Sequence, residues 1–305
     1  MHGIWQFENK LNPVVAREFQ LSLNEGNTPL QTFTINNDLY FKREDLNPSG
    51  SQKDRSLAFQ ISALMQKGIL KYCISSSGNA AISACAYFNE IKSESKHLDV
   101  FVSKTIVQDK LERLNFFRNN NAQINIHKSK IPKKDCFLFA KLNNVYNLRG
   151  SLDELAIEGF KTIGYELQRE LIDCDAIFLS MSSATTLMGI YQSYADSCPA
   201  LHGVQTSKVH PIASVFDKDF IPQTHSLSSA ITDIIAHRKN EAIKAIKSTN
   251  GYGWVIEEEE IMKSYELIQS HGLMVSYDSA LAIAGYLKSI SKFHYNKPVI
   301  LLTGK

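Results

Sequence analysis

The feature that most constrains the fold of this chain is the regular alternation of short apolar runs with longer amphipathic stretches. LYFKRE (39–44) predicts a strand, and the segment from Asp54 to Lys67 then places Leu57, Ile61 and Leu64 on one helical face. Further strands are expected at 71–75, 98–102, 122–126, 175–181 and 298–303. Strands that alternate with longer helices indicate βαβ units and mostly parallel sheets. The sequence therefore predicts an α/β protein.

Composition and charge exclude several classes of function. The 305 residues carry a formal net charge of +2, and no stretch approaches the roughly 20 apolar residues that span a bilayer. We therefore expect no nucleic-acid partner and no membrane partner. The N-terminus lacks the basic start and apolar run of a secretory signal and the Arg- and Ser-rich character of a transit peptide, so a cytoplasmic location is expected.

The cysteines and histidines do not form a metal-binding pattern, and no metal site is predicted. Five cysteines are far apart in the sequence with no CxxC pair, and the nine histidines are dispersed. Several of the cysteines lie inside apolar runs, which favours buried, reduced thiols. The chain also contains no GxGxxG, GxxxxGK[ST], HExxH or GxSxG motif.

The segment NPSGSQKDR (47–55) contains the main candidate for covalent chemistry. Pro48 and Gly50 are turn formers and Ser51 is a good N-cap, so the segment delivers Lys53 to the start of a helix just after a strand. Ligands of open parallel sheets bind at that edge. The positive end of the helix should lower the pKa of the lysine and favour the neutral amine that Schiff-base chemistry requires. An ordinary surface charge is the alternative.

Three other segments occupy the same kind of position. SSSGNAA (75–81) and SMSSATT (180–186) each follow a strand and open a helix, and PVILLTGK (298–305) has Thr303 at the end of an apolar strand. Small residues and the N–H groups of a helix start can bind an anion such as a carboxylate or a phosphate. A simple capped turn is the alternative for the two helix starts.

In chain order, these segments resemble the tryptophan-synthase-β superfamily of pyridoxal phosphate enzymes, also called fold type II, and within it the threonine synthases. The resemblance runs from residue 25 to the C-terminus. It consists of EGNTPL at 25–30, FKREDLNPSGSQKDR at 41–55 (family KxExxNPTGSFKDR), SSGNAA at 76–81 (SSGNTA), IEGFKTIGYEL at 157–167 (EGxKTIAxEI), GLMVSYDSALAIAGYLK at 272–288 (GIFVEPSSAAALAGLLK) and VILLTG at 299–304 (VVLTG). This collinearity is far more specific than any single motif.

The resemblance implies a role for each candidate residue. Lys53 would carry pyridoxal 5′-phosphate as a Schiff base and, once substrate displaces it, move protons as the base. Asn79 would bond the cofactor's 3′-oxygen, and Thr303 would contact the pyridine nitrogen, a neutral partner that suits elimination or replacement rather than transamination. The substrate carboxylate would be held by Ser76, Ser77, Gly78, Asn79 and Ala80. The cofactor phosphate would be held by Ser182, Ser183, Ala184, Thr185 and Thr186.

The chain departs from the family pattern at the cofactor phosphate. The family's phosphate loop is rich in glycine, whereas SMSSATT has none before Gly189. If the loop requires a positive φ, a non-glycine residue there costs about 1–2 kcal/mol. Several charge-assisted bonds to a phosphate, at about 1.5–3 kcal/mol each, outweigh that cost.

The chain also departs from the family pattern around the substrate. Ala80 replaces a Thr, and Ala156 stands where threonine synthases have an Arg for the substrate's phosphate. Arg149 or Lys161 is the candidate substitute. The segment with Tyr277 and Asp278 lacks the family's Glu-Pro, and only Gly304 and Lys305 follow Thr303, so one wall of the site is expected to be reshaped.

The resemblance implies two three-layer α/β/α domains with mostly parallel sheets and the cofactor between them. The smaller domain is expected at 38–145, and the larger one at 1–37 plus 146–305. The implied reaction converts O-phosphohomoserine and water to threonine and phosphate. One alternative is β-elimination or β-replacement on a small amino-acid substrate, as in serine/threonine dehydratases and cysteine synthases. A second is a degenerate, non-catalytic paralogue. A homodimer is the family expectation.

Overall fold

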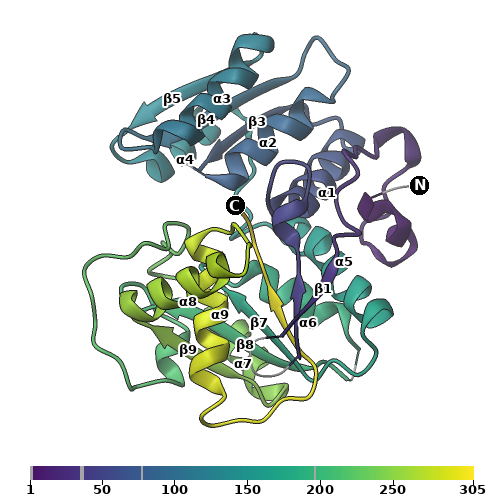
Figure 1. Ribbon diagram of the computed structural model, residues 1–305. Helices are drawn as coiled ribbons and strands as arrows, with labels where there is room; N and C mark the ends of the chain where they lie inside the picture. Colours follow the sequence, from purple (N-terminus) through teal and green to yellow (C-terminus); the bar gives the residue numbers. More distant parts are fainter. Residues whose placement is uncertain (1–2, 35–37, 77, 196) are drawn as a thin grey trace. The chain divides into compact units, whose positions relative to one another are not determined.

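The computed structural model describes residues 3–34, 38–76, 78–195 and 197–305, and it divides into two compact units. The first unit combines the N-terminal segment through Glu25 with Lys53–Gly159. The second combines Gly26–Gln52 with Phe160–Lys305. Each unit contains one β-sheet (Figure 1). The domain boundaries expected from the sequence, 38–145 for the smaller domain and 1–37 plus 146–305 for the larger one, stay a prediction.

The first unit is built on a four-stranded sheet of order β5-β4-β3-β6, and its described strands are all parallel. The strands are β3 (Lys71–Ser75), β4 (His97–Ser103), β5 (Ile124–Ser129) and β6 (Tyr146–Asn147). The helices are η1 (Gly3–Lys10), η2 (Arg17–Phe19), α1 (Lys53–Gln66), α2 (Asn79–Asn89), α3 (Gln108–Asn120) and α4 (Pro132–Asn143).

Helices cover both faces of this sheet. Successive strand residues point to opposite faces, and on β3 the ring of Tyr72 contacts Phe88 of α2, whereas Cys73 packs with Cys136 of α4. The two sulfur atoms lie 3.4 Å apart as free thiols, and both side chains are fully buried, as the apolar runs around these cysteines predicted. The first unit therefore has three layers.

The second unit is built on a six-stranded sheet of order β1-β2-β10-β7-β8-β9, in which only β1 pairs antiparallel among the described strands. Its strands are β1 (Leu30–Thr34), β2 (Asp38–Lys42), β7 (Ala176–Ser180), β8 (Ala200–Thr206), β9 (Tyr252–Ile256) and β10 (Pro298–Leu301). Its helices are η3 (Glu44–Leu46), α6 (Thr185–Ser193), η4 (Ala213–Val215), α7 (Lys239–Ser248), α8 (Glu258–Ser270) and α9 (Tyr277–Ser289), together with most of α5 (Glu154–Glu170).

The six-stranded sheet also lies between two layers of helices. A Cβ placed on Gly203 of β8 would meet Ile246 of α7, and the next residue, Val204, meets Gly285 of α9. Because neighbouring strand residues face opposite sides, α7 and α9 cover opposite faces. The predicted class is confirmed: the chain is α/β with mostly parallel sheets and three-layer units.

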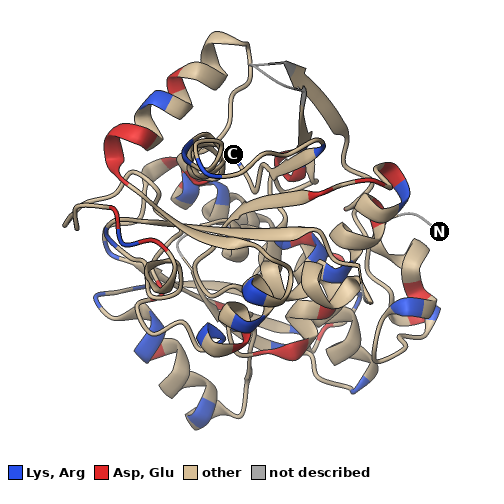
Figure 2. Ribbon diagram, turned by 90° about the horizontal axis from the view of Figure 1, so that it is seen from below, with Lys and Arg blue, Asp and Glu red and all other residues tan. Residues whose placement is uncertain are grey.

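Local sequence explains where the helices begin and end. Gly68 has φ +74° and follows the end of α1, a position that favours glycine. Four glutamates, residues 257–260, form the start of α8, where Glu257 and Glu260 make a capping box and the acidic side chains suit the positive helix end. Figure 2 shows both basic and acidic segments at many places along the ribbon.

Glycine is required where α5 approaches α1. A Cβ on Gly159 would lie 2.2 Å from the carbonyl oxygen of Arg55, which is closer than any side chain can sit. Gly159 is the glycine of the IEGFKT segment, so that motif serves close helix packing inside the first unit.

Candidate active site

The loop before Lys53 is fixed to the C-terminal residues of the chain. The backbone N–H of Gln52 donates to the carbonyl of Thr303 at 3.1 Å, and Ser51 forms a β-bridge with Gly304. Gly50, at φ +90°, accepts from the N–H of Lys305 at 3.1 Å. Lys53 follows directly and is the first residue of α1. The side chain of Lys53 is half-buried, so an ordinary, fully exposed surface lysine does not describe it.

The loop between β3 and α2 contains the residues expected to bind the substrate carboxylate. Ser76 donates its backbone N–H to the carbonyl of Phe101 at 3.2 Å, and its hydroxyl accepts from the N–H of Gly78, also at 3.2 Å. Gly78 is the N-cap of α2, while Asn79 and Ala80 are its first two residues and are half-buried. Ser77 lies outside the described residues.

A cation that the sequence did not point to stands beside this loop. A Cβ on Gly78 would lie 3.6 Å from the Nζ of Lys110, which belongs to α3 and is half-buried. The sequence alone does not reveal this contact, because Lys110 lies 32 positions from Gly78 in a stretch whose pattern predicts a surface helix.

The loop between β7 and α6 contains a non-glycine residue with a positive φ, the case for which the sequence predicts a strain energy. Ala184 is the N-cap of α6 with φ +64°, in the left-handed region, and it is almost fully buried. A glycine is the usual residue there, so the alanine costs about 1–2 kcal/mol. The hydroxyls of Ser183 and Thr185 lie 2.9 Å apart at the start of this nine-residue helix. Hydroxyls and helix-start N–H groups are a donor set that fits a phosphate.

Ser182 in the same loop has another partner. Its Oγ accepts from the backbone N–H groups of Thr232 and Asp233, each at 3.0 Å, and donates to the carboxylate of Asp233 at 3.1 Å. A serine hydroxyl has one hydrogen and two lone pairs, so these three bonds use its full capacity. The sequence prediction that all five residues from Ser182 to Thr186 face the cofactor phosphate did not anticipate this contact.

Thr303 is brought next to the strand that carries this loop. β10 pairs in parallel with β7, and the hydroxyl oxygens of Ser180 and Thr303 lie 3.5 Å apart, with Thr303 buried. Within the second unit, the structure therefore brings together the two segments that the sequence assigned to the phosphate and the pyridine nitrogen. This follows from parallel pairing, because the carboxyl ends of neighbouring strands share one sheet edge.

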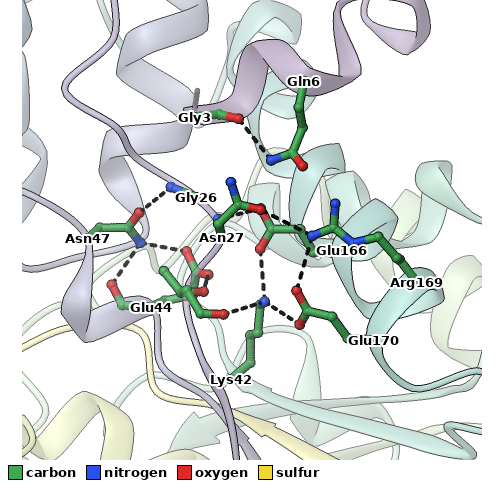
Figure 3. Close-up of polar contacts among 11 residues, drawn as sticks. Gly3, Gln6, Gly26, Asn27, Lys42, Glu44, Asn47, Glu166, Arg169 and Glu170 are labelled. Atoms are coloured by element: carbon green, nitrogen blue, oxygen red, sulfur yellow. Dashed lines mark hydrogen bonds and ion pairs between the residues drawn. The ribbon is translucent and has the colours of Figure 1, made fainter. Parts of the chain in front are cut away.

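A network of charges around the buried Lys42 holds the EGNTPL segment in the second unit (Figure 3). The Nζ of Lys42 lies 2.8 Å from a carboxylate oxygen of Glu166 and 2.7 Å from one of Glu170, and it donates to the carbonyl of Thr28 at 2.7 Å. The other oxygen of Glu166 accepts from the N–H of Asn27 at 2.8 Å.

The same segment is tied to η3 through a second buried carboxylate. Glu44 accepts from the hydroxyl of Thr28 at 2.6 Å and from the side-chain amide of Asn47 at 2.8 Å, while Asn47 accepts from the N–H of Gly26 at 2.9 Å. Removing one member of a buried charge pair typically costs about 3–5 kcal/mol. Lys42 and Glu44 of the FKRED segment therefore serve the scaffold that leads to Lys53.

Ala156 leaves little room for the arginine of threonine synthases. Ala156 is fully buried, and a Cβ placed on Gly150 would lie 3.4 Å from the Cβ of Ala156. Of the two candidate substitutes, Arg149 donates its Nε–H to Ser151 at 3.1 Å, and Lys161 is half-buried on α5.

The described residues contain neither a metal-binding cluster nor a membrane-spanning helix. No group of three or more His, Cys, Asp or Glu side chains there is placed to hold a metal ion. No helix among the described residues has both the length and the apolar character needed to cross a membrane.

Comparison with known proteins places the chain in a family. Residues 21–304 match the family described as "Pyridoxal-phosphate dependent enzyme". This match spans most of the sequence, so the chain belongs to that family, and its cofactor is pyridoxal phosphate. The resemblance drawn from the motifs is confirmed at this level.

The curated relatives include several threonine synthases. The chain is 28% identical over 316 residues to the threonine synthase of Methanocaldococcus jannaschii, covering 95% of this chain and 76% of that protein. It is 24% identical over 309 residues to that of Bacillus sp. (strain ULM1), covering 96% and 86%.

Solved structures with a similar fold carry other activities in their names. A pyridoxal 5′-phosphate-dependent aspartate racemase is 19% identical with a TM-score of 0.77, covering 91% of this chain and 89% of the other. Maize serine racemase is 15% identical with a TM-score of 0.76, covering 99% and 92%. A tomato (Solanum lycopersicum) threonine deaminase is 16% identical with a TM-score of 0.76, covering 99% and 86%. At these identities the likeness concerns the fold alone.

Proposed function

We propose that this protein is a pyridoxal-phosphate-dependent lyase or synthase that resembles threonine synthase and converts O-phosphohomoserine and water to threonine and phosphate. The observation that carries the proposal is the collinear series of motifs from EGNTPL to VILLTG, with the candidate loops at the carboxyl ends of parallel strands. A cytoplasmic homodimer acting on a small amino acid belongs to the same proposal.

Each candidate residue has one task in this proposal. Lys53 holds the cofactor through its amine and later accepts and returns the substrate proton. Asn79 and Thr303 orient the ring, and Thr303 does so from a buried position beside Ser180. The cofactor, when bound, supplies the electron sink for elimination and replacement. The residues Ser182–Thr186 bind its phosphate, and Ser76–Ala80 bind the substrate carboxylate.

A second candidate function is elimination or replacement at the β-carbon of serine, threonine or a serine ester. The observation that favours it is Ala156, because a fully buried alanine packed close to Gly150 cannot supply the bidentate contact of an arginine to a phosphate ester. The names of the serine racemase and threonine deaminase structures are compatible with it. A non-catalytic paralogue is the third candidate.

One experiment separates these candidates. Purified protein is loaded with the cofactor and incubated in parallel with O-phosphohomoserine, serine and threonine, while released phosphate and keto acid are measured. Phosphate release supports the leading proposal, keto-acid formation from serine or threonine supports the second, and neither product from any substrate supports the third.

The assignment of Lys53 is tested separately. Lys53→Ala is expected to lose the yellow colour of the bound cofactor and about 10³-fold or more of activity, because no amine remains to hold the cofactor or move the proton. Lys67→Ala, which removes an exposed lysine just after α1, is the matched control and should keep both. A borohydride-trapped adduct on any other residue would refute the assignment.

A further inference from the structure

The segment from Ser228 to Asp233, called here the 228–233 strap, is held at both ends in the second unit. At its start, the hydroxyl of Ser228 and the N–H of Ala230 donate to the carboxylate of Asp278 at the start of α9. At its end, the N–H groups of Thr232 and Asp233 donate to Ser182. Ile231, between the two anchors, is buried in the core of this unit.

Both anchors of the strap stand where the chain departs from the family pattern. Ser182 lies in SMSSATT, where the resembling enzymes have a glycine-rich loop, and Asp278 replaces the first serine after their Glu-Pro pair. A glycine has no hydroxyl to hold Asp233, and a serine has no charged carboxylate to accept from Ser228 and Ala230. The two departures therefore form one structural feature, which the sequence could not show.

The strap places a negative charge against the loop that is expected to bind a phosphate. The carboxylate of Asp233 accepts the hydrogen of Ser182, three positions before the first residue of α6. That hydroxyl consequently has no hydrogen left to donate to a phosphate oxygen. A carboxylate near a helix start is itself favourable, because the helix dipole attracts any anion there.

We propose that Asp233 is an internal anion that competes with the cofactor's phosphate for the 182–186 loop and so limits cofactor affinity. The inference rests on the proposed role of this loop. A phosphate carries about two negative charges at neutral pH, and a carboxylate within a few ångströms repels it across a partly solvated loop. Tight binding of the cofactor then requires the Asp233 side chain to withdraw from Ser182.

The test is cofactor affinity in Asp233→Asn, which removes the charge while keeping an oxygen that can accept from Ser182. The dissociation constant of pyridoxal phosphate is measured by absorbance titration, and that of inorganic phosphate by the shift in thermal unfolding. Asp233→Asn is expected to bind both about tenfold more tightly than the wild type. Ser182→Ala, which removes the hydroxyl that holds the carboxylate, is expected to shift both constants in the same direction.

The matched control is Asp173→Asn. Asp173 is an exposed acid of the same unit, paired with Lys297 at 3.1 Å and located before the first residue of β7, whereas the loop follows its last residue. This variant removes the same charge and should leave both affinities unchanged. An equal gain in the control would mean that only net charge matters and would overturn the proposal.

The remaining outcomes are also decisive. Weaker binding in Asp233→Asn and Ser182→Ala would show that the contact positions the loop for the phosphate, and unchanged binding would show that it has no influence; either result rejects competition. If wild type and variants alike failed to bind pyridoxal phosphate at Lys53, the proposed function would fail instead. Inorganic phosphate affinity, which does not require Lys53, distinguishes the two failures.

Discussion

The loops at 76–80 and 182–186 read alike in the sequence, but the structure gives them different surroundings. Both follow a parallel strand and open a helix. The first is capped by Gly78, with the ammonium of Lys110 beside it. The second is capped by Ala184 in a left-handed conformation, with the carboxylate of Asp233 bonded to Ser182. Similar local sequence therefore does not imply similar affinity for an anion.

The difference teaches that the charge near each loop comes from another part of the chain. Lys110 lies on α3 and Asp233 lies in the 228–233 strap, and neither belongs to the loop that it faces. Because the two neighbouring charges have opposite signs, removing the charge of Lys110 should weaken anion binding at the first loop. Removing the charge of Asp233 should strengthen it at the second.

The two units are expected to differ most in their response to acid. The histidines of the four-stranded sheet, His97 and His127, lie partly exposed beside Asp99. In the second unit, His202 is fully buried, accepts from the indole N–H of Trp254 at 3.2 Å and stacks on Phe178; burial lowers its pKa to about 3.

A histidine whose pKa is lowered in the folded state takes up protons on unfolding. Its contribution to stability is therefore intact above pH 6.5 and is lost as the pH falls from 6.5 toward 3. We expect the free energy of unfolding to drop by about 2 kcal/mol between pH 7.5 and 5 from this residue. Urea titrations at both pH values measure the drop, and His202→Phe should reduce it. An identical drop in that variant would exclude His202 as its source.

Lys110→Gln tests whether the ammonium of Lys110 contributes to anion binding at the 76–80 loop. Removing the ammonium beside Gly78 is expected to raise the KM for the amino-acid substrate about tenfold and leave the affinity for pyridoxal phosphate unchanged, because the neighbouring loop is the one assigned to the substrate carboxylate. Lys104→Gln removes an exposed lysine just past β4 and is the control. A loss of cofactor affinity without a change in KM would reverse the assignment of the two loops.

The smallest effect is expected on the unfolding free energy when Ala184 or Ala80 is replaced by glycine. Ala184→Gly relieves the left-handed alanine but adds freedom to the unfolded chain, so the net gain in unfolding free energy should be about 0.5–1 kcal/mol. Ala80→Gly, in the first turn of α2, places glycine in an ordinary helix and should destabilise by a similar amount. Chemical denaturation measures both. Destabilisation by Ala184→Gly would mean that the alanine is not strained.

The sequence by itself determined the class of this protein. Alternating strands and helices predicted a parallel α/β fold, and the ordered motifs around Lys53 and Thr303 predicted the pyridoxal phosphate family, because periodicity and short motifs are local properties. The parallel pairing of β7 with β10 brings Ser180 and Thr303 together.

Only the tertiary structure decided which side chains lie beside each loop. Three sets of contacts join residues separated by 32 to 128 positions: Lys110 beside Gly78, Asp233 on Ser182, and the buried Lys42 paired with Glu166 and Glu170. Local patterns contain no information about such pairs, because their contact depends on how distant elements pack. The sequence could predict strain in the 182–186 loop only for the case that a residue there has a positive φ. The structure shows Ala184 in that conformation, which the surrounding packing imposes.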